Sequence, residues 1–186
     1  TMSFDENKGL TIQRNQGPYR MVIVEFADFL CPHCRVAYPT LEAFAQGHPD
    51  VKLIFKPFPL DGKCNKDLKQ QGDGLRCQLA ASVFCAEQMG QKGWAAHHWI
   101  FDRQESIHSK SFDWIRDQLS QELKIDSKEL QKCVDSDPIN ELIAATSKEG
   151  FTAKIPGTPA IFVNGKNLDR GYFLPVLQEV YNKISN

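Results

Sequence analysis

The 186-residue sequence predicts an α/β fold in which a long helical segment interrupts a small sheet. Two apolar runs, residues 21–26 and 51–56, are typical of buried strands. A third strand is expected to begin at Ala160. The roughly 100 residues between the second and third strands have helical rather than strand character and are too many for a loop. This interrupted pattern and the chain length favour one compact unit.

The elements follow one another in a simple order. About the first 10 to 15 residues are expected to form an extended arm, and the strand over residues 21–26 comes next. A helix should begin at Pro32, because proline suits the first helical turn, where its missing N–H costs nothing. The second strand should end near Phe58. The chain should finish with a helix over residues 172–184, whose apolar side chains recur at helical spacing and would pack on the sheet.

Apolar residues at helical spacing predict helices in the middle of the chain over residues 74–89, 94–101, 112–123 and 139–146. Capping residues agree with this pattern. Ser111 precedes the third of these helices, Asp126-Ser127 precedes a short helix over residues 128–133, and Asp137-Pro138 precedes the last one. We expect Trp94, Trp99 and Trp114 to be packing residues of this helical part.

The most informative motif is Cys31-Pro32-His33-Cys34, which opens a helix directly after a strand. At a helix N-terminus, the macrodipole and free backbone N–H groups favour a thiolate, so Cys31 is predicted to be the nucleophile and Cys34 the resolving cysteine. His33 is either an exposed polar residue of the first turn or a further source of thiolate stabilisation. A CxxC pair also occurs in zinc sites, but the remaining cysteines and histidines contain no second CxxC or HxxxH pair, so we expect no metal here.

A second motif lies at residues 157–165, GTPAIFVNG, where Thr158-Pro159 precedes an apolar strand and Asn-Gly closes it. Proline is excluded from the ladder of a central strand but is accepted at its start. A cis Thr158-Pro159 bond would turn backbone groups toward a nearby dithiol. An ordinary trans proline at a strand edge is the alternative, and it is the more frequent one in proteins.

The strand, the CPHC helix and the late GTPA-IFVNG segment together resemble the thioredoxin superfamily, specifically its DsbA-like thiol-disulfide oxidase branch, over nearly the whole chain. The resemblance implies a thioredoxin fold with an inserted α-helical domain, with residues 1–60 and 157–186 in the thioredoxin part and residues 61–156 in the insertion. It also implies that Pro159 is cis and that Thr158 and Pro159 hold a peptide substrate beside the dithiol. Phe29, Leu30 and Pro32 could add apolar contacts, although packing is the expected role of Phe29.

Glu25 falls where this branch carries a buried acidic residue, and Lys56 resembles a basic partner sometimes found in the next strand. A charge in an apolar strand is costly and needs an explanation. Glu25 could exchange a proton with the thiol of Cys34 during catalysis. Alternatively, it forms a structural ion pair with Lys56. Taken alone, Lys56 is expected to be a strand-end lysine that extends its amine to water.

Four cysteines remain after the CPHC motif, and six in a chain of this size indicate an oxidising compartment. Cys64 and Cys77 flank a polar segment that would gain from a clamp, which favours structural disulfides Cys64–Cys77 and Cys85–Cys133. Such a loop closure contributes about 3 kcal/mol in the chain-entropy model. The alternative is that some are free buried cysteines acting as small hydrophobes, above all Cys85 in its apolar run.

Composition excludes several classes of protein. With 22 basic and 23 acidic residues and no basic block, nucleic-acid binding has no support. No segment approaches the roughly 18 apolar residues of a membrane span, and the first residues lack the pattern of a signal peptide. We expect a periplasmic or otherwise extracytoplasmic, monomeric protein without a cofactor. His97 and His98 are expected to be structural residues rather than metal ligands, because neighbouring positions on a helix point about 100° apart and cannot easily share one metal ion.

The CPHC motif and the resemblance to the DsbA-like branch together predict an oxidase that introduces disulfides into reduced or unfolded protein substrates. A weaker resemblance, in residues 57–65, is to DsbA-like domains fused to vitamin K epoxide reductase-like membrane proteins, which implies a quinone-linked membrane partner that reoxidises the dithiol. A disulfide reductase or isomerase would share the same motifs. A metal-binding module or a chaperone-like binding module would belong to a different class, and neither would depend on thiol exchange.

Overall fold

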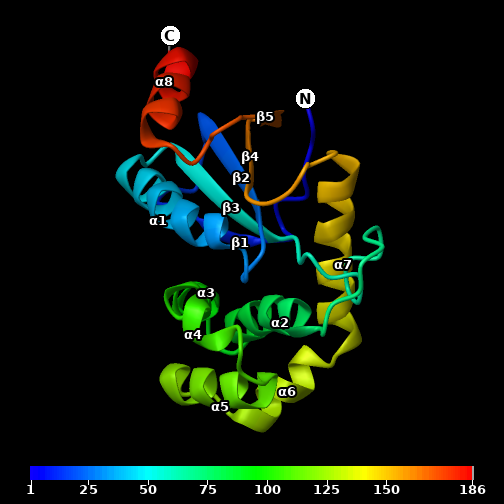
Figure 1. Ribbon diagram of the computed structural model, residues 1–186. Coiled ribbons are helices and arrows are strands. Elements are labelled where there is room, and N and C mark those ends of the chain that lie inside the picture. Colours follow the sequence, from blue (N-terminus) through cyan, green and yellow to red (C-terminus); the bar gives the residue numbers. More distant parts are fainter. Residues whose placement is uncertain (186) are drawn as a thin grey trace.

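The computed structural model describes residues 1–185, and within this range the chain forms one five-stranded sheet (Figure 1). The strand order is β1-β3-β2-β4-β5. The central pair β2 and β3 is parallel, whereas β1, β4 and β5 each run antiparallel to their neighbour. The strands are β1 (Leu10–Ile12), β2 (Met21–Ala27), β3 (Val51–Pro57), β4 (Ala160–Val163) and β5 (Lys166–Asn167).

Different elements cover the two faces of the sheet. Helices α1 (Pro32–Gly47) and α8 (Leu174–Ser185) cover one face, where Ile23, Leu41 and Leu177 share a buried cluster. On the other face, Phe26 packs edge-to-face against Phe4 of the N-terminal arm, with 5.4 Å between ring centroids. Side chains along β2 alternate between the faces, because successive residues of a strand point to opposite sides. The same alternation decides where the charged residues of β2 and β3 point.

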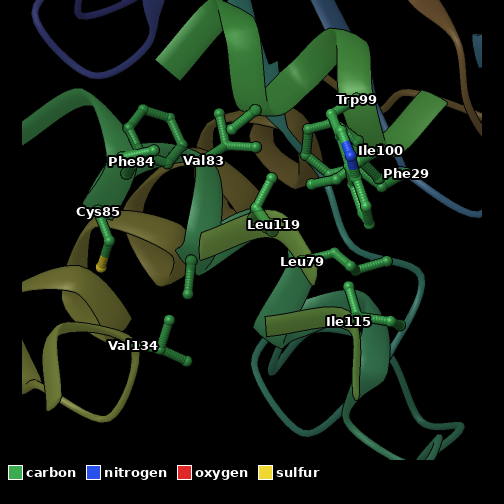
Figure 2. Close-up of a cluster of buried hydrophobic side chains, with 14 of the residues drawn as sticks. Phe29, Leu79, Val83, Phe84, Cys85, Trp99, Ile100, Ile115, Leu119 and Val134 are labelled. Atoms are coloured by element: carbon green, nitrogen blue, oxygen red, sulfur yellow. The ribbon is translucent and has the colours of Figure 1, made fainter. Parts of the chain in front are cut away.

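Between β3 and β4 the chain forms a group of helices that lies beyond one end of the sheet (Figure 1). They are α2 (Leu75–Gln88), α3 (Gly93–Asp102), α4 (Gln104–Ile107), α5 (Phe112–Leu123), α6 (Ser127–Val134) and α7 (Asp137–Thr152). Leu79 and Val83 of α2 face Ile115 and Leu119 of α5 across a buried core (Figure 2). Phe29, from the loop after β2, enters the same core, so the loop that carries the CPHC motif is anchored in the helices.

Helix α7 connects the helical group to the sheet. It runs alongside both parts (Figure 1), and the hydroxyl of Thr146 donates a 2.9 Å hydrogen bond to the carbonyl oxygen of Pro57 at the end of β3. The helical and strand-forming regions therefore share a contact surface, and the exact division at residues 60/61 and 156/157 stays a prediction.

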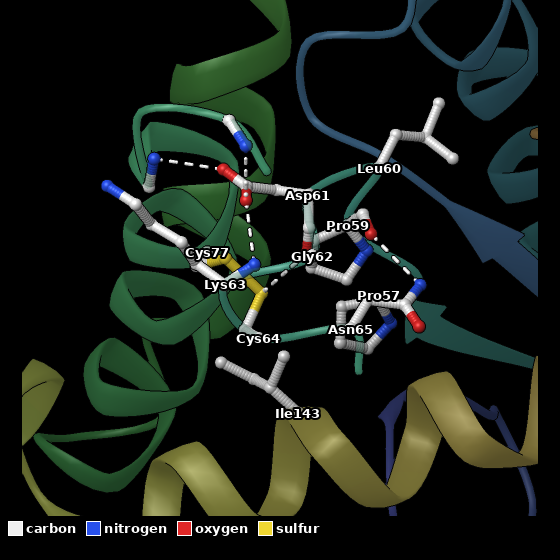
Figure 3. The surroundings of a disulfide bond; sticks show 12 residues. Pro57, Pro59, Leu60, Asp61, Gly62, Lys63, Cys64, Asn65, Cys77 and Ile143 are labelled. Atoms are coloured by element: carbon white, nitrogen blue, oxygen red, sulfur yellow. Dashed lines mark hydrogen bonds between the residues drawn. A yellow bond between two sulfur atoms is a disulfide. The ribbon is translucent and has the colours of Figure 1, made fainter. Parts of the chain in front are cut away.

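Two disulfides join the same cysteine pairs that the sequence favours, Cys64–Cys77 and Cys85–Cys133. Both sulfurs of Cys85–Cys133 come from helices, α2 and α6. The first disulfide lies beside the segment after β3, where the buried carboxylate of Asp61 accepts hydrogen bonds from the backbone N–H groups of Gly72 and Gly74, each 2.9 Å long (Figure 3). A loop without regular structure is thereby held by one carboxylate and one covalent bond.

Several details of the elements confirm or correct the sequence predictions. Ser111 and Asp126 are N-caps, and their side chains accept hydrogen bonds from backbone N–H groups of the following turn. Helix α7 begins two residues earlier than predicted: Asp137 and Pro138 are already helical and Ser136 is the N-cap. The predicted N-terminal arm contains the short strand β1, which three residues are too few to reveal by alternation. Trp114 is 42% exposed and is not a packing residue.

Candidate active site

The site is built where β2 ends and α1 begins. Cys31 is the N-cap of α1 with an extended backbone, and Pro32 occupies the first helical turn. The backbone N–H groups of Cys34 and Arg35 both donate to the carbonyl oxygen of Cys31, at 3.1 and 3.3 Å. This geometry places the sulfur of Cys31 at the positive end of the helix macrodipole. Cys31 is 8% exposed and Cys34 is fully buried, so a reaction partner can approach only the first cysteine.

The two thiols differ strongly in acidity. A hydrogen bond from the Cys34 thiol, together with bonds from Thr158 and the backbone N–H groups of Cys34 and His33, lowers the pKa of Cys31 to about 5, although burial opposes this shift. Burial raises the pKa of Cys34, and the negative charge of a Cys31 thiolate raises it further. At neutral pH the reduced site therefore holds one thiolate, at Cys31, and one thiol, at Cys34.

The Thr158–Pro159 segment faces this dithiol. Its peptide bond is cis, as the resemblance implies, and the sulfur of Cys31 lies 3.4 Å from the carbonyl oxygen of Thr158, to which it can donate a hydrogen bond when it is a thiol. Beside it lies an open cavity of about 280 Å³, lined among others by His33, Thr158, Pro159 and Tyr172. The exposed His33 thus lies at the rim of the site. A peptide strand placed in this cavity would lie next to Cys31.

Asn164 and Gly165 close the hairpin that follows the proline. Both have positive φ angles, 47° and 77°, which suits the turn between β4 and β5. A side chain at Gly165 would lie 2.1 Å from the carbonyl oxygen of Met2, so only glycine fits there. The side chain of Asn164 in turn accepts a 2.8 Å hydrogen bond from the N–H of Val22 on β2. This hairpin therefore fixes β4, and with it the Thr158–Pro159 segment, against the strand that leads to the cysteines.

Glu25 lies on the α1 side of the sheet, 1% exposed, and its Oε1 atom has no hydrogen-bond partner among the described residues. Burial raises the pKa of Glu25 to about 8, and the charges of Glu42 and Cys31 add to the effect. The charge of Glu25 also raises the pKa of Cys34. The protonation of the resolving cysteine therefore depends on the charge of Glu25, which agrees with the proton-exchange interpretation of Glu25.

The alternative interpretation of Glu25, an ion pair with Lys56, is wrong. In the register of the parallel strands Glu25 is level with Phe55, and Lys56 is level with Phe26, so the two charged side chains point to opposite faces of the sheet. Lys56 instead contacts Glu149 of α7 at 2.7 Å. Lys56 is 0% exposed, so the expectation that its amine reaches water is also wrong.

The amine of Lys56 is fully coordinated inside the protein. Besides Glu149, it donates hydrogen bonds to the carbonyl oxygens of Asp5 and Lys8, at 2.6 and 2.8 Å. These three partners come from α7 and from the N-terminal arm. Lys56 therefore fastens both elements to the sheet and has no part in the dithiol site.

Two residues that support the motif were not predicted. The buried carboxylate of Asp28, just after β2, accepts 2.8 Å hydrogen bonds from the N–H groups of Leu30 and Leu60, and it also pairs with Arg76. The N–H of Asp28 donates to the sulfur of Cys34 at 3.5 Å. An aspartate directly after an apolar strand and before the motif is the pattern that could have indicated this role.

Gln104 is the second such residue. Its side-chain amide donates hydrogen bonds to the carbonyl oxygens of Phe29 and Cys31, at 2.8 and 3.0 Å. Gln104 lies in α4, about 70 residues after the motif, and no local sequence pattern links the two. Phe29 itself is 1% exposed and packs against Phe55 and Phe101, which agrees with its expected packing role.

His97 and His98 of α3 both reach the carboxylate of Glu42 on α1. The Nδ1 atom of His97 lies 3.6 Å from one oxygen, and the Nε2 atom of His98 lies 2.6 Å from the other. Burial lowers the pKa of His97 well below its usual value, whereas the hydrogen bond to Glu42 raises that of His98. The two rings can approach the same residue although neighbouring helical positions point about 100° apart, because each ring lies near a different oxygen of the Glu42 carboxylate.

The sheet, the dithiol at a helix N-terminus and the cis-proline segment that faces it define a protein of the thioredoxin-like class. A family model described as the DSBA-like thioredoxin domain matches residues 22–181. The chain therefore belongs to the DsbA-like family of thiol-disulfide oxidoreductases, and the predicted fold class, a thioredoxin fold with an inserted helical domain, is confirmed.

Individual relatives agree with this assignment. The chain is 28% identical over 153 residues to a probable disulfide bond formation protein D of Bacillus cereus, a match that covers 77% of this chain and 65% of that protein. In fold it resembles oxidised BdbD from Bacillus subtilis, with a TM-score of 0.76, 20% identity, and 97% and 94% of the two chains covered. A thioredoxin-like oxidoreductase from Silicibacter pomeroyi gives a TM-score of 0.75 at 20% identity, with 96% and 92% covered. The chain thus spans a little under two thirds of the curated relative.

Proposed function

We propose that this protein is a thiol-disulfide oxidase that introduces disulfides into reduced or unfolded protein substrates outside the cytoplasm, with Cys31 as the nucleophile and Cys34 as the resolving cysteine. The observation that carries the proposal is the asymmetry of the two thiols. Cys31 is accessible and has a pKa of about 5, whereas Cys34 is buried with a raised pKa. A stabilised thiolate favours the reduced enzyme, and an enzyme whose reduced form is stabilised is an oxidant.

The first step starts from the oxidised Cys31–Cys34 pair. A substrate thiolate attacks the sulfur of Cys31, the Cys31–Cys34 bond breaks, and a mixed disulfide between substrate and Cys31 forms. The electron pair of the broken bond leaves on the sulfur of Cys34, which takes up a proton because its pKa is raised. Glu25, whose pKa of about 8 keeps its carboxyl largely protonated at neutral pH, would supply that proton.

In the second step, another thiolate of the substrate attacks the substrate sulfur of the mixed disulfide. A disulfide forms within the substrate, and Cys31 leaves as a thiolate. Because its pKa is low, Cys31 is a good leaving group and needs no proton at this point. Thr158 and Pro159, beside Cys31 and at the edge of the open cavity, would hold the peptide strand during both steps.

The oxidised site must then be regenerated by transferring two electrons to another protein. We infer a quinone-linked membrane partner, since a chain that supplies disulfides needs an oxidant of its own. Two further disulfides and the name of the Bacillus cereus relative support an oxidising, extracytoplasmic location. Among the described residues, no helix combines the length and the apolar character needed to cross a membrane. Because electrons would leave through the sulfur of Cys31, we propose that a membrane partner approaches the face that carries this residue.

The decisive experiment is the equilibrium of the Cys31–Cys34 pair with reduced and oxidised glutathione, read by mass spectrometry so that the two structural disulfides are followed separately. A reduction potential near the roughly −120 mV of DsbA supports the oxidase. A potential near the roughly −270 mV of thioredoxin would overturn it in favour of a reductase. These values differ by about 7 kcal/mol for a two-electron couple, so the result is unambiguous.

One double variant, Cys31→Ser with Cys34→Ser, separates thiol chemistry from the other classes of function. It should have lost the oxidation of a reduced peptide substrate. If the double variant kept the full effect on substrate proteins, a chaperone-like binding module would replace the oxidase. Stoichiometric metal bound through Cys31 and Cys34 after purification would instead indicate a metal-binding module, and elemental analysis of the double variant against the native protein tests this.

A further inference from the structure

Away from the dithiol, three potential metal ligands meet between the sheet-covering helix α1 and the inserted helix α3. Glu42 comes from α1, and His97 and His98 come from α3. One ligand atom from each residue lies within 4.8 Å of the other two. The carboxylate of Glu42 is between the rings, at 3.6 Å from Nδ1 of His97 and 2.6 Å from Nε2 of His98.

The polar atoms of this cluster are incompletely matched. His97 is 0% exposed, yet neither of its ring nitrogens has a hydrogen-bond partner among the described residues, and the same holds for Oε1 of Glu42. A neutral imidazole has one donor and one acceptor, and leaving buried polar atoms unpaired is costly. Buried unpaired groups of this kind call for an explanation such as a bound ion.

The walls around His97 are aromatic and cannot satisfy its nitrogens. The rings packed around it, at centroid distances between 4.8 and 5.6 Å, are Phe29, Tyr38, Phe55, Trp94 and Phe101. An aromatic wall fixes the plane of an imidazole and keeps water away. The Nδ1 atom of His97, which is the ring nitrogen near Glu42, therefore remains available to bind an ion that lies beside the carboxylate.

The geometry points to a binding site for a divalent transition metal, with Zn²⁺ as the best match, formed by Glu42, His97 and His98. Two imidazole nitrogens and a carboxylate oxygen are ligands that zinc accepts, at bond lengths of about 2.0 to 2.2 Å. Tetrahedral bonds of that length place neighbouring ligand atoms about 3.4 Å apart. The three ligand atoms lie within 4.8 Å of one another, so rotations of the side chains would have to bring them to this spacing around an ion.

The fourth position would be open to solvent. The side chain of His98 is 41% exposed and that of Glu42 is 10% exposed, so an ion can enter past His98 while His97 closes the inner side. A site with three protein ligands and one open position is the arrangement that can also take a water molecule or a ligand atom from a partner. The ion would connect α1, which begins with the CPHC motif, to α3 of the helical insertion.

The test uses the full chain with Cys31 and Cys34 in the disulfide, so that the dithiol offers no thiolate ligands. After treatment with a chelator and its removal, Zn²⁺ alone is titrated by calorimetry, and bound zinc is counted by elemental analysis. Co²⁺ alone is added as a spectroscopic probe, since its visible absorption distinguishes tetrahedral from octahedral coordination. The variants are Glu42→Gln and His98→Gln, which keep side-chain size. His108→Gln, at the exposed histidine that follows the last residue of α4, is the matched control.

We expect one zinc per chain, tetrahedral cobalt absorption, and a dissociation constant that rises at least about tenfold in Glu42→Gln and in His98→Gln, since even the loss of an outer partner of a ligand costs that much. His108→Gln should bind as the native protein does. His98 is partly exposed, so its variant is expected to fold, and circular dichroism verifies this.

Three outcomes would overturn the proposal. They are the absence of zinc binding to the oxidised protein, binding that both variants retain unchanged, and binding that occurs only after Cys31 and Cys34 are reduced. The last result would place the metal at the dithiol. None of these outcomes bears on the oxidase activity, because the glutathione equilibrium is measured in chelator-treated protein.

Discussion

Glu25 and Lys56 lie on opposite faces of the sheet, although the strands that carry them are hydrogen-bonded neighbours. Lys56 is compensated by Glu149 and by two backbone carbonyl oxygens. Among the described residues Glu25 has no ion-pair partner, and burial raises its pKa to about 8. One strand pair thus contains a compensated buried charge on one face and a carboxyl group with an unpaired oxygen on the other.

Glu25 should make the protein less stable as the pH rises. Its pKa is about 8 in the folded protein against an ordinary value of 4.5, so between these pH values the folded state holds a proton that the unfolded chain has released. The free energy of unfolding therefore decreases as the pH rises through this window. In Glu25→Gln the decrease should be absent, and the variant should be more stable than the native protein by on the order of 3 kcal/mol at pH 7.

Urea unfolding of the oxidised protein at pH 5, 7 and 8 measures this difference, since burial and Glu42 still act on Glu25 when Cys31 carries no charge. Glu122→Gln, at an exposed position of α5, is the control and should not change the pH dependence. The same Glu25 variant should slow the release of Cys34 in stopped-flow oxidation of a reduced peptide. A variant that is less stable than the native protein at pH 8 would show that Glu25 is charged and compensated.

Removing the amine of Lys56 should destabilise the protein strongly. Lys56→Met keeps the length of the side chain but leaves Glu149 and the carbonyl oxygens of Asp5 and Lys8 without their partner. Breaking a buried ion pair by removing one side costs about 3 to 5 kcal/mol. Chemical denaturation of the oxidised protein should show this loss, with an unchanged glutathione equilibrium because Lys56 lies away from the dithiol.

Lys148→Met is the matched control for Lys56→Met. Lys148 also pairs with an acidic residue, Asp67, but its side chain is 64% exposed. Exposed ion pairs contribute about 0 to 1 kcal/mol, so this variant should be nearly neutral. Equal losses in the two variants would refute the role assigned to the buried amine.

The contrast between predicted and observed roles of these residues has a physical cause. Apolar patterns report burial along one element, and they therefore located β2, β3, α2 and α5 from the sequence, whereas Pro32 marked the start of the CPHC helix. The partner of a charged residue depends on strand register and on segments far away in the chain. Lys56 pairs with Glu149, which lies more than ninety residues later in the chain. Local sequence patterns carry no information about a partner at that separation.

In the candidate site, too, some residues could be predicted from local sequence patterns and others could not. Cys31, Cys34 and Pro159 stand in short motifs whose chemistry can be recognised in the sequence, and the structure brings Cys31 and Thr158 together. Asp28 and Gln104 act on the motif through hydrogen bonds to backbone atoms. Such bonds impose no spacing on the sequence, so these two residues became visible only in the folded chain.

Gln104 should be essential for the stability of the loop before α1. Its amide group donates hydrogen bonds to the buried carbonyl oxygens of Phe29 and Cys31. Gln104→Leu would leave the carbonyl oxygen of Phe29 without this donor, whereas that of Cys31 would keep the N–H groups of the first turn of α1. An unsatisfied buried group costs about 1 to 3 kcal/mol, so a loss of that size is expected in thermal or urea unfolding. Gln118→Leu, at an exposed position of α5, should change stability by less than about 0.5 kcal/mol. A neutral Gln104→Leu would show that water replaces the amide.

The acidity of Cys31 should depend on the hydrogen bond from its neighbour. The bond from the Cys34 thiol is the largest cause that lowers the pKa of Cys31 to about 5. Cys34→Ser keeps a donor at that position and Cys34→Ala removes it, while both leave Cys31 as the one free cysteine of the native pair. A hydrogen bond to a charged group contributes about 1.5 to 3 kcal/mol, so the pKa of Cys31 should be about 1 to 2 units higher in the alanine variant than in the serine variant.

The rate of alkylation by iodoacetamide as a function of pH measures this pKa directly, because only the thiolate reacts. In the native reduced protein the rate should be constant at neutral pH and fall as the pH drops through about 5. The stabilisation of the reduced state has the same sign: it is complete above the ordinary thiol pKa, decreases as the pH falls, and is lost below about 5. In Cys34→Ala the fall in rate should occur at a higher pH than in Cys34→Ser. If the two variants titrate together, the thiolate is stabilised by the helix N-terminus and Thr158 rather than by Cys34.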